Sequence, residues 1–149
     1  METKRILVAE DSPNDVELML TALAEHNLAN EVVVARDGVE ALDYLYRRGR
    51  FDQRASGNPL VIFLDLKMPR MDGLEALRHI KSDADLKMIP VVVLTSSAEE
   101  RDVVESYNLG VNAYVVKPVV FDNFMEVVKQ LGLFWVLINE PPPGTVGKR

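Results

Sequence analysis

Residues 60–69 read Leu-Val-Ile-Phe-Leu-Asp-Leu-Lys-Met-Pro, an apolar run that ends abruptly in a carboxylate. A run without polar alternation is typical of a strand that is buried on both faces of a parallel sheet. Ligands of parallel α/β sheets bind outside the carboxyl ends of the strands. The stretch therefore predicts a parallel sheet and places Asp65 at the edge of that sheet where function is expected.

Similar apolar runs recur along the chain and alternate with amphipathic stretches. We expect strands at Arg5–Ala9, Glu31–Ala35, Leu60–Leu64, Pro90–Thr95 and Asn112–Val116, and helices near 13–26, 37–48, 73–82, 98–108 and 121–138. Ser12 followed by Pro13 is typical of a helix start, and Gly110 is typical of a helix end. Strands that alternate with helices predict a doubly wound α/β fold with a five-stranded parallel sheet.

Charged residues follow three of the five predicted strands. Glu10 and Asp11 come directly after the first strand, Asp65 after the third, and Lys117 after the fifth. These side chains would converge at one edge of the sheet. Two carboxylates about 4 Å apart repel one another by roughly 4 kcal/mol at an effective dielectric constant near 20. The cluster therefore predicts a bound divalent cation.

Composition excludes several classes of protein. The 149 residues, 48% of them hydrophobic, suit one globular domain with a proper core. Lys and Arg number 17 against 23 Asp and Glu, and a net charge of −6 argues against direct binding to nucleic acid. The absence of cysteine excludes disulfides and thiol catalysis. The chain begins without a signal-peptide pattern and has no apolar stretch long enough to span a bilayer, so we expect a soluble cytoplasmic protein.

The loop after the third predicted strand resembles the phosphoacceptor loop of bacterial response-regulator receiver domains. The resemblance rests on residues 64–73, on Glu10-Asp11, on Thr95 after the fourth strand and on Lys117-Pro118 after the fifth. The resemblance covers about residues 4–132, and over this range the chain is similar to chemotaxis CheY proteins. The long loop before the third strand and Phe134-Trp135 are more similar to single-domain regulators partnered with phytochrome histidine kinases. The family fold has the strand order 2-1-3-4-5 and is flavodoxin-like.

The resemblance implies a role for each of these residues. Asp65 would accept a phosphoryl group from a kinase histidine, and Lys117 and Thr95 would contact the phosphoryl oxygens. Tyr114 would move with Thr95 as the conformational switch. Mg²⁺ would be held by Asp11, Asp65 and the backbone carbonyl of Lys67, with Glu10 acting through a metal-bound water.

The end of the chain predicts the oligomeric state. Residues 1–140 would form a single receiver domain with an extended last helix, and residues 141–149, which begin with three prolines, a disordered tail. Part of the apolar surface of this helix lies off its main stripe and predicts a homodimer through the fourth helix, fifth strand and fifth helix. These off-stripe residues are Val127, Leu133, Phe134 and Leu137. With no room for an effector domain, output would pass through protein contacts or a phosphotransfer protein.

Two other functions remain as alternatives. A Mg²⁺-dependent aspartyl-phosphate phosphatase would need an aspartate two residues after the nucleophile, and Lys67 stands there. An FMN carrier would need a phosphate-binding loop after the first strand, where the acidic pair Glu10-Asp11 would repel the FMN phosphate. We therefore expect a signalling switch that catalyses only its own phosphorylation and dephosphorylation, rather than an enzyme.

Overall fold

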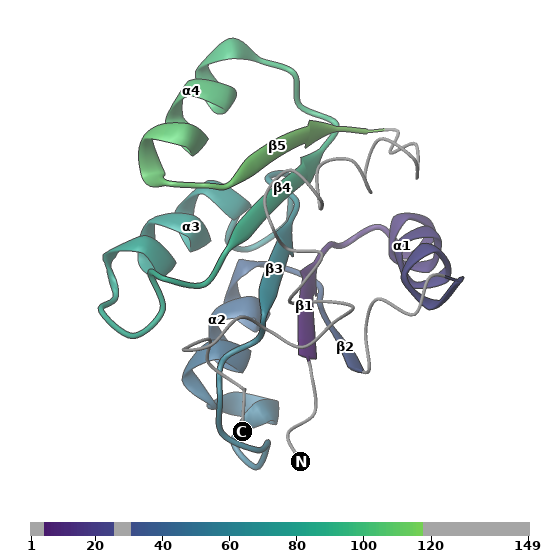
Figure 1. The fold of residues 1–149 in the computed structure, drawn as a ribbon, viewed down its shortest axis with the longest axis vertical. Helices are drawn as coiled ribbons and strands as arrows, with labels where there is room; N and C mark the ends of the chain where they lie inside the picture. Colours follow the sequence, from purple (N-terminus) through teal and green to yellow (C-terminus); the bar gives the residue numbers. More distant parts are fainter. Residues whose placement is uncertain (1–4, 26–30, 118–149) are drawn as a thin grey trace, which may run out of the picture.

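The structure, a computed structural model, describes residues 5–25 and 31–117. Within these ranges five parallel strands form one sheet in the order β2-β1-β3-β4-β5 (Figure 1). The strands are β1 (Arg5–Ala9), β2 (Glu31–Ala35), β3 (Val61–Leu64), β4 (Val91–Thr95) and β5 (Ala113–Val116). The predicted parallel α/β fold and its strand order are confirmed.

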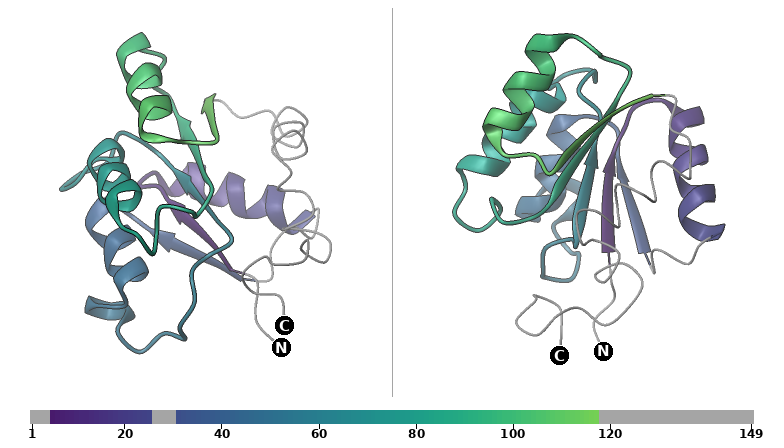
Figure 2. Two further views of the ribbon diagram at one scale, coloured as in Figure 1. Left: turned by 60° about the vertical axis from the view of Figure 1, so that its left-hand side comes forward. Right: turned by 45° about the horizontal axis from the view of Figure 1, so that its top comes forward.

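Helices lie on both faces of this sheet. The helices α2 (Gly38–Tyr46), α3 (Gly73–Ser82) and α4 (Glu100–Leu109) cover one face, and α1 (Pro13–Glu25) lies on the other (Figures 1 and 2). A short 3₁₀ helix, η1 (Gly49–Phe51), follows α2. Each connection returns the chain to the amino ends of the strands, because all five strands run parallel. The carboxyl ends of the strands therefore all lie on one side of the molecule.

Both faces of the central strands are buried, which explains their continuous apolar runs. On the face toward α2 and α3, strand residues join one hydrophobic cluster; they include Leu7, Ala9, Ile62, Leu64, Val91 and Val93. The alternate residues on the α1 face are also buried; they include Ile6, Val8, Phe63 and Val92. A strand that is packed on both faces has little freedom to shift, so the loops at its carboxyl end start from fixed points.

The observed element bounds lie close to the predicted ones. The first two strands match, and each of the other three begins one residue later than expected. Ser12 caps α1, since its hydroxyl accepts from Asp15 N–H at 3.3 Å, and Gly110 ends α4 in the left-handed region at φ 101°. The helix predicted over 37–48 ends earlier, at Tyr46, because Arg47 takes a left-handed conformation with φ 55°.

The loop between β3 and α3 is folded tightly against its neighbours. A Cβ atom on Gly73 would lie 2.2 Å from the carbonyl oxygen of Asp65, so only glycine fits where α3 begins. One loop further along the sheet edge, Gly38 N–H donates to the carbonyl of Met71 at 2.9 Å. Arg70, at φ 63°, donates from Nε to Asp37 Oδ2 at 2.7 Å. These contacts fix the backbone that carries Asp65.

The expected helix over 121–138, the tail at 141–149 and the four off-stripe residues of the expected dimer surface lie outside the described residues. The single domain over 1–140 likewise remains a prediction. No helix among residues 5–25 and 31–117 is long and apolar enough to cross a membrane.

Candidate functional site

Three carboxylates meet at the carboxyl edge of the sheet, as the sequence predicts. Glu10, Asp11 and Asp65 each present a carboxylate oxygen within 4.8 Å of the other two. Glu10 and Asp65 are buried, and Asp11 faces solvent. The strands β1 and β3 are hydrogen-bonded neighbours with Ala9 opposite Leu64, so the residues that follow them are brought side by side.

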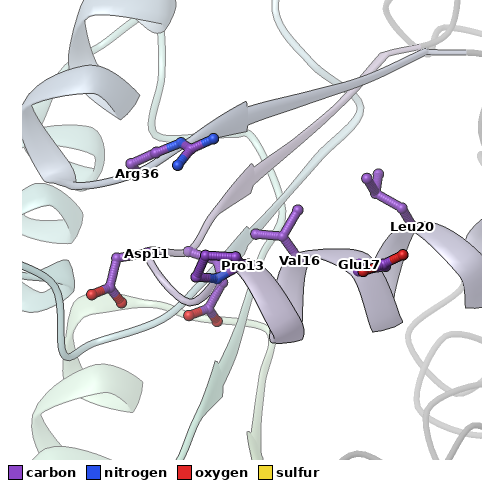
Figure 3. A pocket seen from close by; sticks show the side chains of 7 residues that line it. Asp11, Pro13, Val16, Glu17, Leu20 and Arg36 are labelled. Atoms are coloured by element: carbon purple, nitrogen blue, oxygen red, sulfur yellow. The ribbon is translucent and has the colours of Figure 1, made fainter.

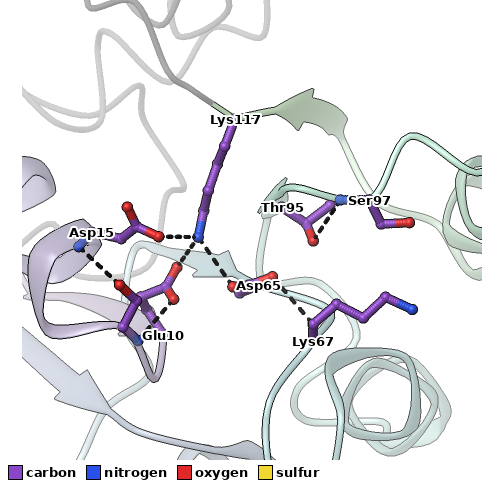
Figure 4. A network of polar contacts seen from close by, with 8 residues as sticks. Glu10, Asp15, Asp65, Lys67, Thr95, Ser97 and Lys117 are labelled. Atoms are coloured by element: carbon purple, nitrogen blue, oxygen red, sulfur yellow. Dashed lines mark hydrogen bonds and ion pairs between the residues drawn. The ribbon is translucent and has the colours of Figure 1, made fainter.

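Lys117 reaches into this cluster from the end of β5 (Figure 4). Its ammonium donates to Glu10 Oε1 at 2.6 Å, Asp15 Oδ2 at 2.7 Å and Asp65 Oδ2 at 3.1 Å. Its backbone N–H donates to the carbonyl of Thr95 at 2.8 Å, which continues the β4–β5 ladder. Burial lowers the pKa of Lys117, but the bonds to the carboxylates outweigh it and hold the pKa above its usual range. The lysine is therefore a fixed positive charge.

Asp15 also belongs to the site, although it was not predicted from the sequence. It stands in the first turn of α1 and contacts the ammonium of Lys117 more closely than Asp65 does. No strand-end signal marks Asp15, because it belongs to α1 and does not directly follow a strand. The lysine thus faces one carboxylate more than expected.

Glu10 bears the electrostatic cost of this arrangement. Burial raises its pKa, the hydrogen bond from Lys117 and the one from Ser12 N–H lower it, and the nearby Asp65 raises it further, so that the pKa reaches about 7. One lysine does not neutralise the carboxylates that surround it. A second cation would relieve the repulsion.

The donor set fits a hard divalent cation. The three grouped ligand atoms are all carboxylate oxygens, the ligands that Mg²⁺ and Mn²⁺ prefer. The backbone of Lys67, the remaining predicted ligand residue, lies against Asp65, since its N–H donates to Asp65 Oδ1 at 3.2 Å. Exposed Asp11 leaves one side open to solvent, as a cation that keeps several waters requires.

Thr95 and Tyr114 lie beside the cluster and are connected through Ser97. The hydroxyl of buried Thr95 accepts from Ser97 N–H at 3.3 Å. Tyr114 is half-buried, and its hydroxyl donates to the carbonyl of Ser97 at 2.8 Å. The structure therefore links both predicted switch residues, Thr95 at the end of β4 and Tyr114 in β5, to Ser97 on the loop between β4 and α4.

The side chain of Lys67 points away from Asp65 (Figure 4). Its ammonium lies 3.6 Å from Asp102 Oδ2 and 4.0 Å from Glu99 Oε1. Asp102 is a buried carboxylate of α4 that accepts from Ser97 Oγ at 2.6 Å. This bond from Ser97 lowers the pKa of Asp102 despite burial, and the charges of Lys67 and Arg101 lower it further. Sequence reasoning missed Asp102, since nothing in a first-turn aspartate marks it as buried.

A pocket of about 300 Å³ opens next to the carboxylates along α1 (Figure 3). Asp11 stands at one end of it and Leu20 at the other. Its lining combines apolar side chains with charges of both signs: Glu10, Asp11, Pro13, Val16, Glu17, Leu20 and Arg36. The exposed edge of the site thus continues into a surface that a partner's side chains could enter.

Most of the chain is similar to known proteins. Residues 6–129 match the response regulator receiver domain family. The chain belongs to the response-regulator receiver family. Phosphorylation of an aspartate is typical of this family. The response regulator Rcp1 of Synechocystis sp. is 40% identical over 133 residues, which are 89% of this chain and 89% of that protein.

Solved structures extend the likeness. The bacteriophytochrome response regulator RtBRR superposes with a TM-score of 0.83 at 57% identity and covers 96% of this chain and 86% of its own. The phosphorylated cyanobacterial phytochrome response regulator RcpA has a TM-score of 0.77 at 41% identity, with 91% and 95% covered. Rcp1 itself is known in a Mn²⁺-bound form, with a TM-score of 0.77 at 39% identity and 93% and 99% covered. The expected family, including its phytochrome-associated members, is confirmed.

Proposed function

We propose that this receiver accepts a phosphoryl group on Asp65 from a sensor histidine kinase and changes conformation in response. The observation that carries the proposal is the surrounding of Asp65. Its carboxylate stands among the grouped oxygens of Glu10 and Asp11 and receives a hydrogen bond from Lys117 at 3.1 Å. Phosphoryl transfer depends mainly on positioning and charge neutralisation, and this cluster offers both.

In the transfer step Asp65 is the nucleophile. A carboxylate oxygen of Asp65 attacks the phosphorus of a phosphohistidine, the new O–P bond forms as the N–P bond breaks, and the imidazole leaves. The product is an acyl phosphate. Lys117 already lies at hydrogen-bond distance from Asp65 Oδ2, so its ammonium can follow the phosphoryl oxygens without a large movement. Thr95 supplies a hydroxyl from the neighbouring strand end.

The cation of this site would be Mg²⁺, held by Asp11, Asp65, the carbonyl of Lys67 and, through water, Glu10. When bound it would offset charge on the transferring group. The oxygen donors favour Mg²⁺ or Mn²⁺, and the Mn²⁺-bound form of Rcp1 supports a divalent ion here.

The output would pass through Thr95 and Tyr114. Phosphorylation replaces one carboxylate charge with a group of about −1.5 to −2, and the site then needs another hydrogen-bond donor. Inward movement of Thr95 would break its bond with Ser97 N–H and free Tyr114 from the carbonyl of Ser97. The face formed by α4 and β5 would change, and it carries exposed Val104, Tyr107 and Val116.

The partners follow from the chemistry and from the relatives. Receivers of this family work with histidine kinases, and the likeness to RtBRR and RcpA favours a phytochrome kinase. We include a homodimer through α4, β5 and the segment after them, a phosphotransfer protein as a further acceptor, and a cytoplasmic location. The acidic charge of −6 gives no reason to include nucleic acid. Lys67 stands where a phosphatase would need its acid, which disfavours that alternative.

The decisive experiment is phosphorylation by acetyl phosphate and Mg²⁺, measured by intact-protein mass. We expect one base-labile phosphoryl group in the wild type and none in Asp65→Asn. Asp43→Asn is a matched control, since Asp43 lies on α2, is paired with Arg48 just after that helix, and should leave the reaction unchanged when replaced. Incorporation by Asp65→Asn at the wild-type rate would contradict the assignment.

A further inference from the structure

The buried carboxylate of Asp102 has no part in the transfer chemistry, yet it is linked to the site. A carboxylate that is removed from water needs partners that satisfy it. Asp102 has two: Ser97 Oγ at 2.6 Å and the ammonium of Lys67 at 3.6 Å. Both partner residues are tied to the site through their backbone, since Lys67 N–H donates to Asp65 Oδ1 and Ser97 N–H donates to the Thr95 hydroxyl.

Lys67 is the exposed member of this set. Its backbone is tied to Asp65 by the 3.2 Å bond from Lys67 N–H, whereas its side chain is 58% exposed. The second acidic neighbour, Glu99, is equally exposed and lies 4.0 Å away. An exposed ion pair of this length is weak, so the ammonium can exchange partners at little cost.

Phosphorylation would create a competitor for Lys67. The charge near Asp65 would grow from that of a carboxylate to about −1.5 to −2, directly beside the residue whose side chain Asp102 now holds. An ammonium that turned toward the phosphoryl group would pair with its oxygens and stand in the path of an attacking water. Asp102, whose carboxylate keeps the Lys67 ammonium away from Asp65, would therefore leave the acyl phosphate open to hydrolysis.

Resting on the proposed phosphorylation of Asp65, we propose that Asp102 is a positioning residue that acts through Lys67. Its carboxylate competes with the phosphoryl group for the Lys67 ammonium and so shortens the lifetime of the acyl phosphate. Ser97 moderates this competition, because its hydroxyl shares the same oxygen, Asp102 Oδ2, that Lys67 approaches.

The test is the rate of phosphate loss after the phosphodonor is removed, in a double-mutant cycle. Asp102→Asn should lengthen the half-life of the phosphorylated protein about threefold to tenfold, the coupling expected of contacting charges. In a Lys67→Met background the same change should alter the half-life by less than about 1.5-fold, because no ammonium remains to be redirected. Asp102→Glu, which keeps the charge, should restore the wild-type half-life.

A second variant, Ser97→Ala, should change the half-life of the phosphorylated protein in the opposite direction. It keeps the proposal testable if Asp102→Asn does not fold. Ser97→Ala leaves Lys67 as the main partner of Asp102. The half-life should therefore shorten when Lys67 is present and should not shorten in the Lys67→Met background. Glu105→Gln is the matched control, since Glu105 is an acidic residue of the same helix that pairs with Arg78 instead. It should leave the half-life unchanged.

The outcomes separate the two proposals. A wild type that takes up no phosphate at Asp65 would overturn the proposed function and this inference together. Normal uptake with an unchanged or shortened half-life in Asp102→Asn would overturn the role of Asp102 alone. The same would follow if Asp102→Asn lengthened the half-life equally with Lys67 and with Met at position 67, because a purely structural effect of the helix would not depend on the lysine.

Discussion

A half-buried cation has opposite surroundings at the two ends of the sheet, as Lys117 and Arg54 show. At the carboxyl end, Lys117 faces three carboxylates. The pKa of Glu10 is raised there to about 7, and burial is the largest cause. At the amino end, Arg54 faces neutral carbonyl oxygens. It donates from Nε to Tyr44 at 2.7 Å and from Nη1 to Ala55 at 2.6 Å and Gly57 at 3.0 Å, and it lies 4.0 Å from the centre of the Tyr44 ring.

This difference separates stability from function. Arg54 caps the carbonyls at the end of α2 and holds the loop before β3, so its bonds are complete without any further partner. The carboxyl end keeps an excess of negative charge that only another cation or a protonation relieves. An arrangement of that kind costs stability and is retained where chemistry needs it. Changes at the two ends should therefore be distinguishable in the laboratory.

The largest expected effect is that of Lys117→Met. Removal of the ammonium leaves Glu10, Asp15 and Asp65 without their shared donor. We expect phosphorylation by acetyl phosphate and Mg²⁺ to slow roughly 100-fold, the usual cost of losing one preorganised donor to a developing charge. The initial rate of incorporation measures this.

Lys81→Met is the matched control for that variant. Lys81 is a half-buried lysine that donates to the carbonyls of Lys87 and Ile89 at 3.0 and 3.1 Å, at the amino end of the sheet. Its loss should lower stability and leave the phosphorylation rate within about twofold of the wild type. Equal rate losses in the two variants would refute the division between the ends.

The next effect is on stability alone. Arg54→Met should lower the free energy of unfolding by about 2 kcal/mol, because several carbonyls lose a charged donor and Tyr44 loses its stacked cation. Urea denaturation measures the loss, and the phosphorylation rate should not change. Arg50→Met, in which a 60% exposed arginine next to Phe51 is replaced, should cost less than about 1 kcal/mol.

Much of the fold was predictable because its signals are local. Uninterrupted apolar runs identified all five strands to within one residue, since strands that are buried on both faces carry no polar alternation. Ser12 and Gly110 were correct helix boundaries for the same reason, because caps are set by one residue's own hydrogen bond or φ angle. The early end of α2 was missed, since nothing in the type of Arg47 announces φ 55°.

The site was predictable as far as strand ends determine it. Glu10, Asp11, Asp65 and Lys117 follow strands directly and so had to meet. Asp15 and Asp102 belong to helices, and whether a helical aspartate faces the site depends on how the helix rotates against the sheet. That rotation is set by tertiary packing. The roles given to Lys67, Thr95 and Tyr114 as ligand and switch remain predictions.

A smaller effect than that of Arg54→Met concerns a stabilising pair at the carboxyl end of the sheet. Burial raises the pKa of Asp37, but the bonds from Arg70 and from Glu40 N–H outweigh it and leave the pKa below its usual value of 3.8. A lowered pKa means that the charged form stabilises the fold. The contribution is complete above pH 3.8 and disappears as the pH falls through the lower, folded-state pKa.

Asp37→Asn should therefore cost about 1 kcal/mol at pH 7, since asparagine still caps α2 but loses the charge-assisted bond with Arg70. The difference between variant and wild type should shrink steadily below pH 3.8 in urea titrations. Asp72→Asn makes the same change at the N-cap of α3, where Asp72 accepts from Glu75 N–H at 2.9 Å. An equal, equally pH-dependent loss there would assign the effect to helix capping and not to Arg70. A loss confined to Asp37→Asn, with phosphorylation unchanged, would show that the carboxyl end also contains bonds that serve stability alone.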